Sequence, residues 1–517
     1  MRTEKHSKRR IHFLSYSLLL LVLAFVTILI ASKNSPLYLF NDWVDLNAFM
    51  TMGKGWLNGL IPYRDLFEQK GPVLYFIFAI ANAISRTYFG IFLIEVLFFF
   101  ATLFMVNKIA RRYLPLRESF LVCVLMSWIL TMSPYFTGGG SVEELSYVFI
   151  LYSIDLVLEL SDNSFKITNK QAFLSGLFFS VLFWIKYTMV GSYLAAFIIL
   201  FGLYLYRRQI YTLLSMTLFS LLGFMTITAP VLIYFGLHNA LDDLKFCYFT
   251  SNISLYPNNP SATFIWKIIN ATTLYINKYT NNPLLLFIFV FMLIYLIVSK
   301  RILQTDFSKF LYCAIYFGLI LTTLYGGRTY NYYFLILFPF SILPVISLIY
   351  FMEQKHNSKT SFGLMLAFSF IMMLGSNNNL LNSKLYPDNP TYTLNGKYKE
   401  PFQFAFSRII NDTKNPSLLN YGFLDSGLYH HADVLPSNRY FERQNISNEA
   451  LPEMMAEQNE IIAKRRVTFV ITRTSSDVSE EKGVPKNIRS NYTLVAEQHQ
   501  QTMTNPIFTY RLYQLKN

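Results

Sequence analysis

The sequence predicts a polytopic α-helical membrane protein with a small α/β domain at its C-terminal end. The first observation is composition, because 53% of the 517 residues are hydrophobic and only 14% are charged, which is too apolar for a water-soluble chain of this length. The second is that long apolar runs recur through the first 376 residues and Lys and Arg collect in alternate loops between them. The third is a change to polar, strand-like sequence after residue 380.

About eleven apolar runs are long enough to cross a bilayer, since a helix of roughly 20 residues spans its hydrocarbon core. They cover residues 11–31, 88–108, 118–136, 142–160, 172–186, 187–206, 211–235, 283–299, 308–325, 332–351 and 361–376. The run Pro72–Ile84 is apolar but short. We therefore expect it to lie at the interface or to re-enter the membrane rather than cross it.

The loops between these runs predict the orientation, because short cytoplasmic loops accumulate Lys and Arg. The basic positions expected inside are Lys8-Arg9-Arg10, Arg111-Arg112 with Arg117, Lys166 with Lys170, Arg207-Arg208, Lys300-Arg301, and Lys355 with Lys359. The N-terminus is then cytoplasmic and the C-terminal domain lies outside a bacterial inner or plasma membrane. If Pro72–Ile84 did cross, every later assignment would invert and the basic-loop pattern would fail.

The same pattern predicts two domains. Residues 1–380 form a transmembrane domain with outer loops at 32–87, 137–141, 236–282 and 326–331. Residues 381–517 form an extracytoplasmic α/β domain, in which a helical stretch and four strand-like runs are recognisable. The helix covers Asn448–Lys464, and the strands cover Leu418–Phe423, Val467–Thr472, Thr493–Ala496 and Phe508–Leu515.

The net charge of +14 does not indicate a nucleic-acid partner. Residues 384–517 hold 16 Lys and Arg against 14 Asp and Glu, so most of the excess lies in the membrane part. Cytoplasmic loops and anionic lipid headgroups account for positive charge there. The three cysteines allow no internal disulfide framework, because Cys123 and Cys313 fall inside predicted spans.

The first outer loop is the most informative segment of the chain. Residues 41–72 contain the acids Asp42, Asp45, Asp65 and Glu68 together with Lys70. Exposure at the membrane surface would by itself keep such carboxylates ionised. Their setting argues for more, because aromatic residues and glycines surround them, as in a packed loop.

This loop resembles that of bacterial GT-C glycosyltransferases, a superfamily that includes protein O-mannosyltransferases and aminoarabinose transferases. The similar residues are Asp45-x-x-x-Phe49-x-x-x-Gly53, Gly59-x-x-Pro62-Tyr63-Arg64-Asp65 and Lys70-Gly71-Pro72. Three later segments resemble family motifs and are also predicted outside: residues 138–144 (GGGSVEE), 185–187 and 326–339 (GGRTYNYYFLILFP). The sequence departs from the family at Glu68-Gln69 and at Asn331, which leaves the sugar and subfamily open.

The resemblance implies transfer of a sugar from a polyprenyl-phosphate carrier to an extracytoplasmic acceptor such as a cell-envelope glycan, a lipid or a protein. In that reading Asp45 is the general base, with Asp42 as the next candidate, and inversion follows from a single displacement. Glu143 or Glu144 orients the acceptor or binds a metal ion. Relatives differ in their need for metal, so the sequence leaves a divalent metal ion open, and it indicates no other cofactor.

The remaining candidate residues are assigned to substrate binding. Lys70, Lys186 and Arg328 would hold the carrier phosphate, because fixed cations in a poorly solvated site stabilise phosphate charge better than water does. Asp65, Glu68 and Tyr332 complete this set.

Each assignment has a structural alternative. Asp42 and Asp65 are equally consistent with solvated loop charges. Glu143 and Glu144 are equally consistent with capping the span that begins at residue 142. Lys186 and Arg328 are consistent with anchoring at the membrane interface.

The main alternative function is a transporter or flippase for lipid-linked saccharides. It predicts charges within the spans and broken helices. Few acids fall inside spans, namely Glu95, Asp155 and Glu159, so the sequence favours chemistry at the outer surface. A polymerase for lipid-linked saccharides would more typically carry a large Arg-bearing loop in the second half, whereas residues 236–282 contain no Arg.

Overall fold

The structure is a computed structural model. It describes residues 2–257, 262–282, 286, 289–290, 292–299, 302–355, 359–389, 393–394, 397–501 and 507–516. The chain divides into two compact units that each combine distant segments. The first unit holds Met1–Ser32, Phe92–Val231 and Ser261–Asn378, and the second holds Lys33–Ile91, Leu232–Pro260 and Asn379–Asn517.

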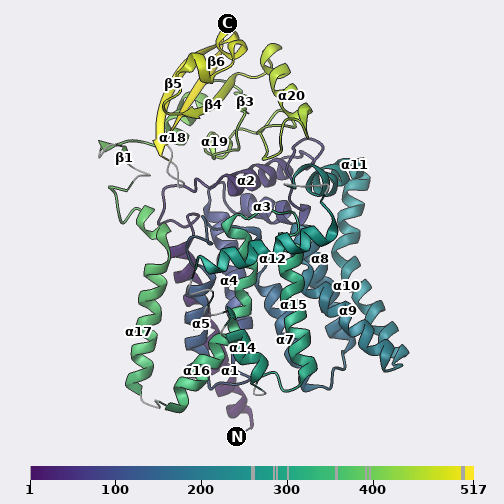
Figure 1. The fold of residues 1–517 in the computed structure, drawn as a ribbon. Helices are drawn as coiled ribbons and strands as arrows, with labels where there is room; N and C mark the ends of the chain where they lie inside the picture. Colours follow the sequence, from purple (N-terminus) through teal and green to yellow (C-terminus); the bar gives the residue numbers. More distant parts are fainter. Residues whose placement is uncertain are drawn as a thin grey trace. The chain divides into compact units, whose positions relative to one another are not determined.

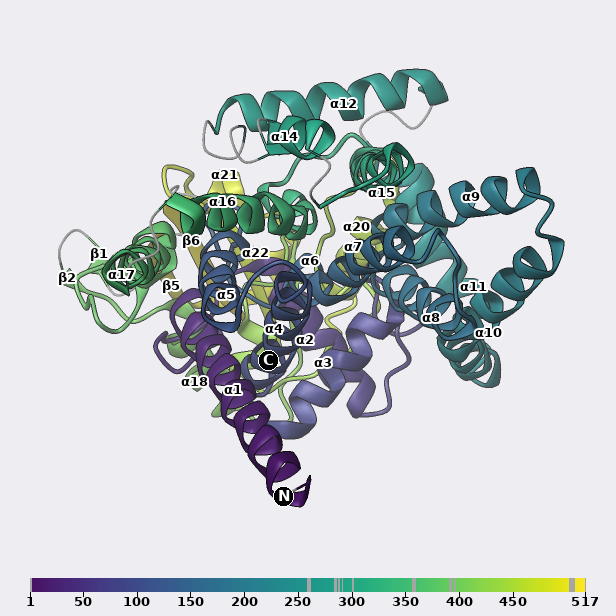
Figure 2. The same cartoon turned by 90° about the horizontal axis from the view of Figure 1, so that it is seen from below.

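The first unit is almost entirely helical (Figures 1 and 2). Two of its helices, α4 (Phe89–Ala110) and α10 (Ile210–Leu237), continue across the boundary into the second unit. The others are α1 (Arg2–Ala31), α5 (Leu116–Leu130), α6 (Val142–Leu145), α7 (Tyr147–Asp162), α8 (Asn169–Lys186), η1 (Tyr187–Met189), α9 (Gly191–Tyr206), α12 (Phe264–Thr280), α14 (Met292–Val298), α15 (Asp306–Leu324), η4 (Asn331–Ser341), α16 (Ile342–Lys355) and α17 (Lys359–Ser376).

Small residues let the helices of this unit approach closely. A Cβ atom at Gly191 on α9 would lie 2.2 Å from the carbonyl oxygen of Gly318 on α15. A Cβ atom at Gly176 on α8 would likewise lie 1.9 Å from the carbonyl oxygen of Ser220 on α10. Close backbone packing through Gly and Ser is typical of helices in membranes, where dispersion rather than the hydrophobic effect drives association.

The ends of several helices meet on one side of the first unit. The Arg112 guanidinium, just after α4, binds Asp155 at 2.9 Å and Asp162 at 3.2 Å, both on α7. The rings of Phe165 and Phe307 lie 4.6 Å apart beside the start of α15, and Arg117 lies 3.9 Å from the ring of Phe362 on α17. The predicted basic loops after α4 and α7 therefore share one side of this unit.

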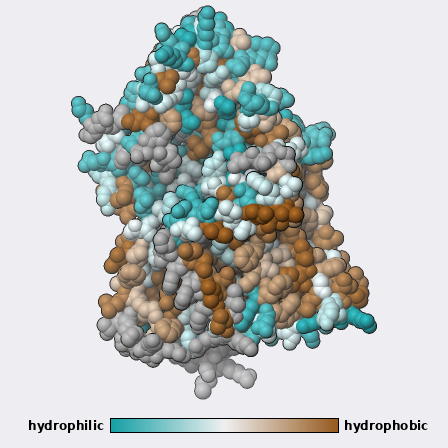
Figure 3. Space-filling view, in the orientation of Figure 1, coloured by the Kyte–Doolittle hydropathy of each residue, from teal (hydrophilic) through white to brown (hydrophobic). Residues whose placement is uncertain are grey.

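Five helices among the described residues are long and apolar enough to span a membrane. They are Phe89–Ala110, Asn169–Met189, Ile210–Leu237, Asp306–Leu324 and Asn331–Met352, and shorter apolar helices cover Ser15–Ala31, Pro72–Ile84, Gly191–Tyr206 and Phe362–Ser376. On the face shown in Figure 3, hydrophobic residues cover helices of the first unit, whereas hydrophilic residues cover the sheet of the second. The chain is a multi-pass membrane protein.

Among the described residues, the predicted spans 142–160 and 332–351 are broken helices. The run 142–160 consists of α6 and α7, separated at Ser146. The run 332–351 begins with the 3₁₀ segment η4, which contains Pro339, and continues as α16. Proline removes a backbone donor, which favours such a break. Much of the predicted span 283–299 lies outside the described residues, and the total of eleven stays a prediction.

The second unit combines the first outer loop with the C-terminal region. Its helices and strands are α2 (Val44–Leu57), α3 (Pro72–Ile84), α11 (Leu241–Leu244), η2 (Lys245–Leu255), η5 (Asn378–Asn382), β1 (Thr393–Leu394), β2 (Lys397–Tyr398), α18 (Phe402–Asn411), β3 (Leu418–Tyr421), α19 (Leu428–His431), α20 (Pro452–Ala463), β4 (Phe469–Ser475), α21 (Glu480–Gly483), α22 (Lys486–Asn491), β5 (Tyr492–Gln501) and β6 (Ile507–Leu515). The predicted boundary at residue 380 stays a prediction, because the C-terminal residues form one compact unit with residues from two earlier segments.

A four-stranded sheet of order β3-β4-β6-β5 forms the C-terminal part of this unit. β3 pairs with β4 in parallel, and the other two pairs are antiparallel. The sheet buries an apolar core with α20 and α22, formed by Leu419, Ile461, Ile462, Val467, Val470, Val484, Ile488, Tyr492 and Tyr513. These strands and α20 coincide with the runs expected from the sequence.

Candidate functional site

Asp45 lies in the first turn of α2 and is half-buried. Asn47 holds this end of the helix, because its side-chain amide donates to the carbonyls of Asn41 at 2.9 Å and Trp43 at 3.0 Å. The unpaired backbone N–H groups of a first helical turn favour negative charge nearby. Asp45 is therefore a carboxylate on a fixed helix end.

Asp42 forms an ion pair two residues before α2 begins. Its Oδ1 lies 2.8 Å from Nζ of Lys33, whose side chain is only 3% exposed. This ion pair holds the Asp42 carboxylate in place, and its assignment as the next candidate base stays a prediction.

Asp65 is tied to its own loop. Its carboxylate accepts from the backbone N–H of Ile61 at 2.7 Å and from the Arg64 guanidinium at 2.9 Å. Burial by itself would raise the pKa of Asp65, but these hydrogen bonds outweigh it and lower the pKa below its usual value. The loop charge is therefore paired within the loop.

Glu68 and Lys70 come together beside Tyr75 on α3. Glu68 is 3% exposed, and its Oε2 accepts from the backbone N–H of Lys70 at 2.8 Å and from the Tyr75 hydroxyl. Nζ of Lys70 lies 3.6 Å from Glu68 Oε1 and 5.6 Å from the centre of the Phe49 ring. The motif residues thus form a packed group of the second unit.

In the first unit, Glu143 and Lys186 form a buried ion pair. Oε1 of Glu143 lies 2.6 Å from Nζ of Lys186, and the Glu143 side chain is fully buried. Nζ of Lys186 also lies 3.5 Å from the centre of the Tyr333 ring, a cation–π geometry. Among the described residues, Glu143 Oε2 has no hydrogen-bond partner, so one carboxylate oxygen can accept from a further donor.

Glu144 belongs to the start of α6. Ser141 caps the helix by accepting from the Glu144 backbone N–H at 3.1 Å, and Glu144 Oε2 accepts from the backbone N–H of Gly140 at 2.9 Å. This is a reciprocal capping arrangement. Glu95 on α4 interacts with Glu144 and accepts from the Ser32 hydroxyl at 2.9 Å. Glu144 thus takes part in the cap of α6, whereas Glu143 pairs with Lys186, and the catalytic assignment of either glutamate stays a prediction.

Arg328 is half-buried in the loop before η4. Tyr332 follows it, and its ring stacks on Tyr330 at 5.8 Å and meets Tyr333 edge-on at 4.9 Å. Lys278 on α12 donates to the side-chain oxygen of Asn331 in the same segment. Aromatic side chains and cations thus lie along residues 328–333.

Three residues of these groups, Lys33, Glu95 and Lys278, were not predicted as site residues from the sequence. Lys33 gave no signal apart from its place beside the first span. Glu95 was visible as an acid inside an apolar run, which is itself an indication of function or pairing. Lys278 lies in a polar outer segment, and only the fold brings it to Asn331.

The adjacent histidines, His430 buried and His431 half-buried, lie among aromatic rings. His430 lies 4.5 Å from Tyr88, and His431 lies 4.6 Å from Phe404, measured between ring centres. Burial lowers the pKa of His430 to about 3 and that of His431 to about 4. No three His, Cys, Asp or Glu side chains among the described residues are grouped to hold a metal ion.

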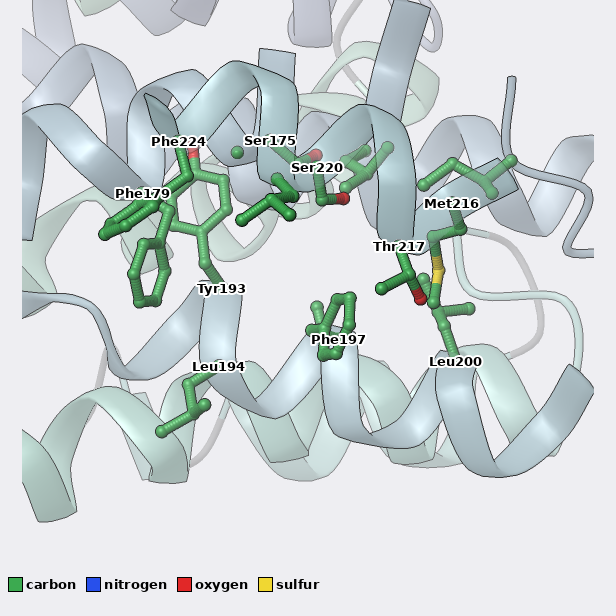
Figure 4. Close-up of a pocket in the computed structure, with 15 residues that line it drawn as sticks. Ser175, Phe179, Tyr193, Leu194, Phe197, Leu200, Met216, Thr217, Ser220 and Phe224 are labelled. Carbon is green, nitrogen blue, oxygen red and sulfur yellow. The ribbon is translucent and has the colours of Figure 1, made fainter. Parts of the chain in front are cut away.

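An apolar cavity of about 310 Å³ lies between α8, α9 and α10 in the first unit. Figure 4 shows Phe179, Phe197 and Phe224 among the side chains that line it. Its lining contains no charged residue, so the cavity suits a hydrocarbon chain and is not a candidate for the chemical step.

No family model matches the sequence. No curated protein matches it either. Two solved structures match its fold over nearly the whole length of both chains. ArnT from Cupriavidus metallidurans bound to undecaprenyl phosphate has a TM-score of 0.61 at 9% identity, covering 96% of this chain and 97% of ArnT. The same protein in its apo state has a TM-score of 0.58 at 8% identity, with coverage of 97% and 98%.

The chain has the GT-C fold. ArnT is an aminoarabinose transferase of the GT-C superfamily, so the resemblance drawn from the outer-loop motifs is confirmed at the level of the fold. At 8–9% identity the match was invisible to a search by sequence, whereas the short motifs around Asp45 and Lys70 were recognisable.

Proposed function

We propose that the protein is an inverting glycosyltransferase that moves a sugar from a polyprenyl-phosphate carrier to an extracytoplasmic acceptor. The observation that carries the proposal is the fold match to ArnT over nearly the full length of both chains, one of them bound to undecaprenyl phosphate. The half-buried carboxylate of Asp45 at the start of α2 adds the chemical group that such a reaction needs.

Asp45 acts as the general base. As the acceptor hydroxyl attacks the anomeric carbon from the face opposite the phosphate, its proton passes to the Asp45 carboxylate. The new bond joins the acceptor oxygen to the anomeric carbon, and the bond from that carbon to the phosphate oxygen breaks. The electron pair leaves with the polyprenyl phosphate, so one displacement inverts the anomeric centre.

Cations that hold the carrier phosphate lower the barrier, because the phosphate gains negative charge as it leaves. Arg328 and Lys186 are assigned this role in the first unit and Lys70 in the second. Lys186 and Lys70 are each paired with a glutamate at rest, which keeps them in place, while Tyr332 offers an aromatic face beside Arg328.

The orientation follows from the basic loops. The N-terminus is cytoplasmic, about eleven helices span a bacterial inner or plasma membrane, and residues 381–517 lie outside. This arrangement fits a transferase that works at the outer leaflet on cell-envelope acceptors, and the helix ends that meet around Arg112 are consistent with it.

The test is sugar transfer by the purified protein from a panel of synthetic polyprenyl-phosphate sugars to a cell-envelope extract. Asp45→Asn is nearly isosteric and removes the base, and we expect it to lower kcat by roughly 10²–10⁴-fold. Asp388→Asn is the matched control, because Asp388 is an exposed acid of the same unit. Donor binding by Asp45→Asn, measured separately, should stay close to that of wild type.

Two results would contradict the proposal. Full activity of Asp45→Asn would show that a residue other than Asp45 is the general base. Absence of transfer from every donor, together with saccharide transport in proteoliposomes, would favour the transporter alternative.

A further inference from the structure

Three polar residues form a line along one face of α2. Asn47, Thr51 and Lys54 are spaced by four and three residues, so they lie one above the other on the helix. Asn47 is fully buried and Thr51 is 2% exposed. Buried polar groups require partners, and residues 425–433 of the C-terminal region supply those of Thr51 and Lys54.

Thr51 and Lys54 contact this segment directly, and Asn47 is connected to it through Tyr88. The Thr51 hydroxyl donates to Asp425 Oδ2 at 2.9 Å. Nζ of Lys54 lies 2.5 Å from Asp433 Oδ1. Asn47 accepts from the Tyr88 hydroxyl at 2.7 Å, and the Tyr88 ring packs on His430. The contact therefore covers two successive turns of the helix.

Gly427 shows how closely the segment approaches α2. Its φ of +97° is a conformation that L side chains rarely adopt, and a Cβ atom there would lie 3.0 Å from Asn47 Oδ1 and 3.1 Å from the Tyr88 hydroxyl. Glycine is required at this position by backbone conformation and by space.

Asp425 is itself held from several directions. It is fully buried, and its Oδ1 accepts from the backbone N–H of Gly427 at 2.9 Å and from the Asn420 side chain at 3.3 Å. Its own backbone N–H donates to Glu442 at 2.6 Å. The Asp425 carboxylate, which accepts from Thr51, is thus held in place by several hydrogen bonds.

We propose that residues 425–433 are a positioning element that holds α2, and with it Asp45, through the Thr51–Asp425 hydrogen bond. Thr51 and Asp425 are positioning residues, since neither is assigned contact with substrate. The inference rests on the proposed function for the role of Asp45, and it gives the C-terminal region a part in the reaction.

The experiment uses the full-length protein and the sugar-transfer assay, with amide hydrogen exchange as a second readout. Thr51→Val removes the hydroxyl at nearly constant volume. We expect kcat to fall about tenfold or more while the donor KM stays within about twofold, and exchange over residues 44–50 to accelerate while exchange over β4 is unchanged. Thr51→Ser restores a hydroxyl and should recover most of the activity. Thr493→Val, at an exposed threonine of β5, should resemble wild type.

A double-mutant cycle tests the pair itself. Asp425→Asn should lower kcat as Thr51→Val does, and the double variant should be no worse than either single variant by more than about twofold, because both remove one interaction. Additive losses would overturn the pairing. Two results for Thr51→Val would overturn the positioning role. One is that kcat and amide exchange stay as in wild type. The other is general damage to the fold, in which kcat, donor affinity, melting temperature and the protection of β4 all decrease together.

The two proposals fail separately. If wild-type protein transfers no sugar, the proposed function fails. In that case amide hydrogen exchange over residues 44–50 alone tests whether residues 425–433 hold α2. Equal protection of residues 44–50 in wild type and Thr51→Val would reject this role.

Discussion

At the scale of single residues, three lysines among the residues described for the site are each paired with a carboxylate. Lys186 pairs with Glu143, Lys70 with Glu68, and Lys33 with Asp42. A buried ion pair costs desolvation of both partners and is strongly destabilised when one is removed. Loss of activity in variants at these positions therefore mixes chemistry with stability, and an uncompensated cation gives a cleaner test.

Lys278 is such a cation. Its neighbour is the neutral side chain of Asn331, and no carboxylate of the described residues pairs with it. Partial burial lowers its pKa, and an anion bound beside it would offset that cost. We expect Lys278→Met to raise the donor KM roughly tenfold, the order of a partly screened ion pair, with kcat nearly unchanged. Steady-state kinetics with a polyprenyl-phosphate sugar measure this effect.

Lys278→Arg should keep the donor KM near that of wild type, because it retains the charge. Lys267→Met on the same helix α12 is the control, since Lys267 lies 4.8 Å from the Tyr325 ring and is assigned no phosphate. An unchanged KM in Lys278→Met would remove this residue from the donor site.

At the scale of elements, the sequence predicted the types of element well and their assembly poorly. Long apolar runs predicted helices, and short apolar strand-like runs predicted strands that overlap β3 to β6, because these signals are local. The close contact of residues 425–433 with α2 had no local signal, because the two segments are hundreds of positions apart. The partners of Asp42 and Glu144 were equally hidden, although Ser141 and Glu144 already had the spacing of a helix cap.

The α2–α3 hairpin supplies a prediction at this scale. A Cβ atom at Gly53 would lie 2.4 Å from the backbone carbonyl carbon of Phe78 on α3, and a backbone cannot yield as a side chain can. We expect Gly53→Ala to destabilise the protein by about 1–3 kcal/mol or more through overpacking. A lower melting temperature of the detergent-solubilised protein measures this.

Gly236→Ala is the matched control for the hairpin. Gly236 is also helical, but its nearest contact for an added Cβ is a Leu241 methyl at 3.8 Å. Its replacement should be neutral or slightly stabilising, because Ala favours helix. Equal melting temperatures for the two variants would show that α3 yields at Phe78.

At the scale of the whole molecule, stability should depend on pH through two neighbouring imidazoles. His430 and His431 have pKa values of about 3 and 4 in the folded protein, against 6.5 when unfolded. Below pH 6.5 only the unfolded chain binds their protons, so stability falls by about 1.4 kcal/mol per pH unit for each imidazole down to its folded pKa. Melting temperatures between pH 7.5 and 4.5 measure the slope.

The double variant His430→Gln/His431→Gln isolates this effect. Burial raises the pKa of Asp425 and of Glu442, so these acids lose stabilising energy as the pH rises and oppose the histidines. Both acids remain in the variant, and the difference between the two pH curves therefore reports the imidazoles. Parallel curves would show that His430 and His431 are accessible to protons in the folded protein.

The membrane topology of the whole chain can be tested directly by cysteine labelling. The basic-loop pattern places Lys166 inside and Lys482 outside, provided that α3 does not cross. The geometry of α3 agrees, because its 13 residues extend only about 20 Å, less than the hydrocarbon core.

In a cysteine-free background, we expect Lys482→Cys to react with a membrane-impermeant maleimide in intact spheroplasts, and Lys166→Cys to react only after permeabilisation. Both positions are exposed, so access by the reagent depends on the side of the membrane. The reverse labelling would mean that α3 crosses, and it would place Glu143, Lys186 and Arg328 on the cytoplasmic side, where an extracytoplasmic acceptor is absent.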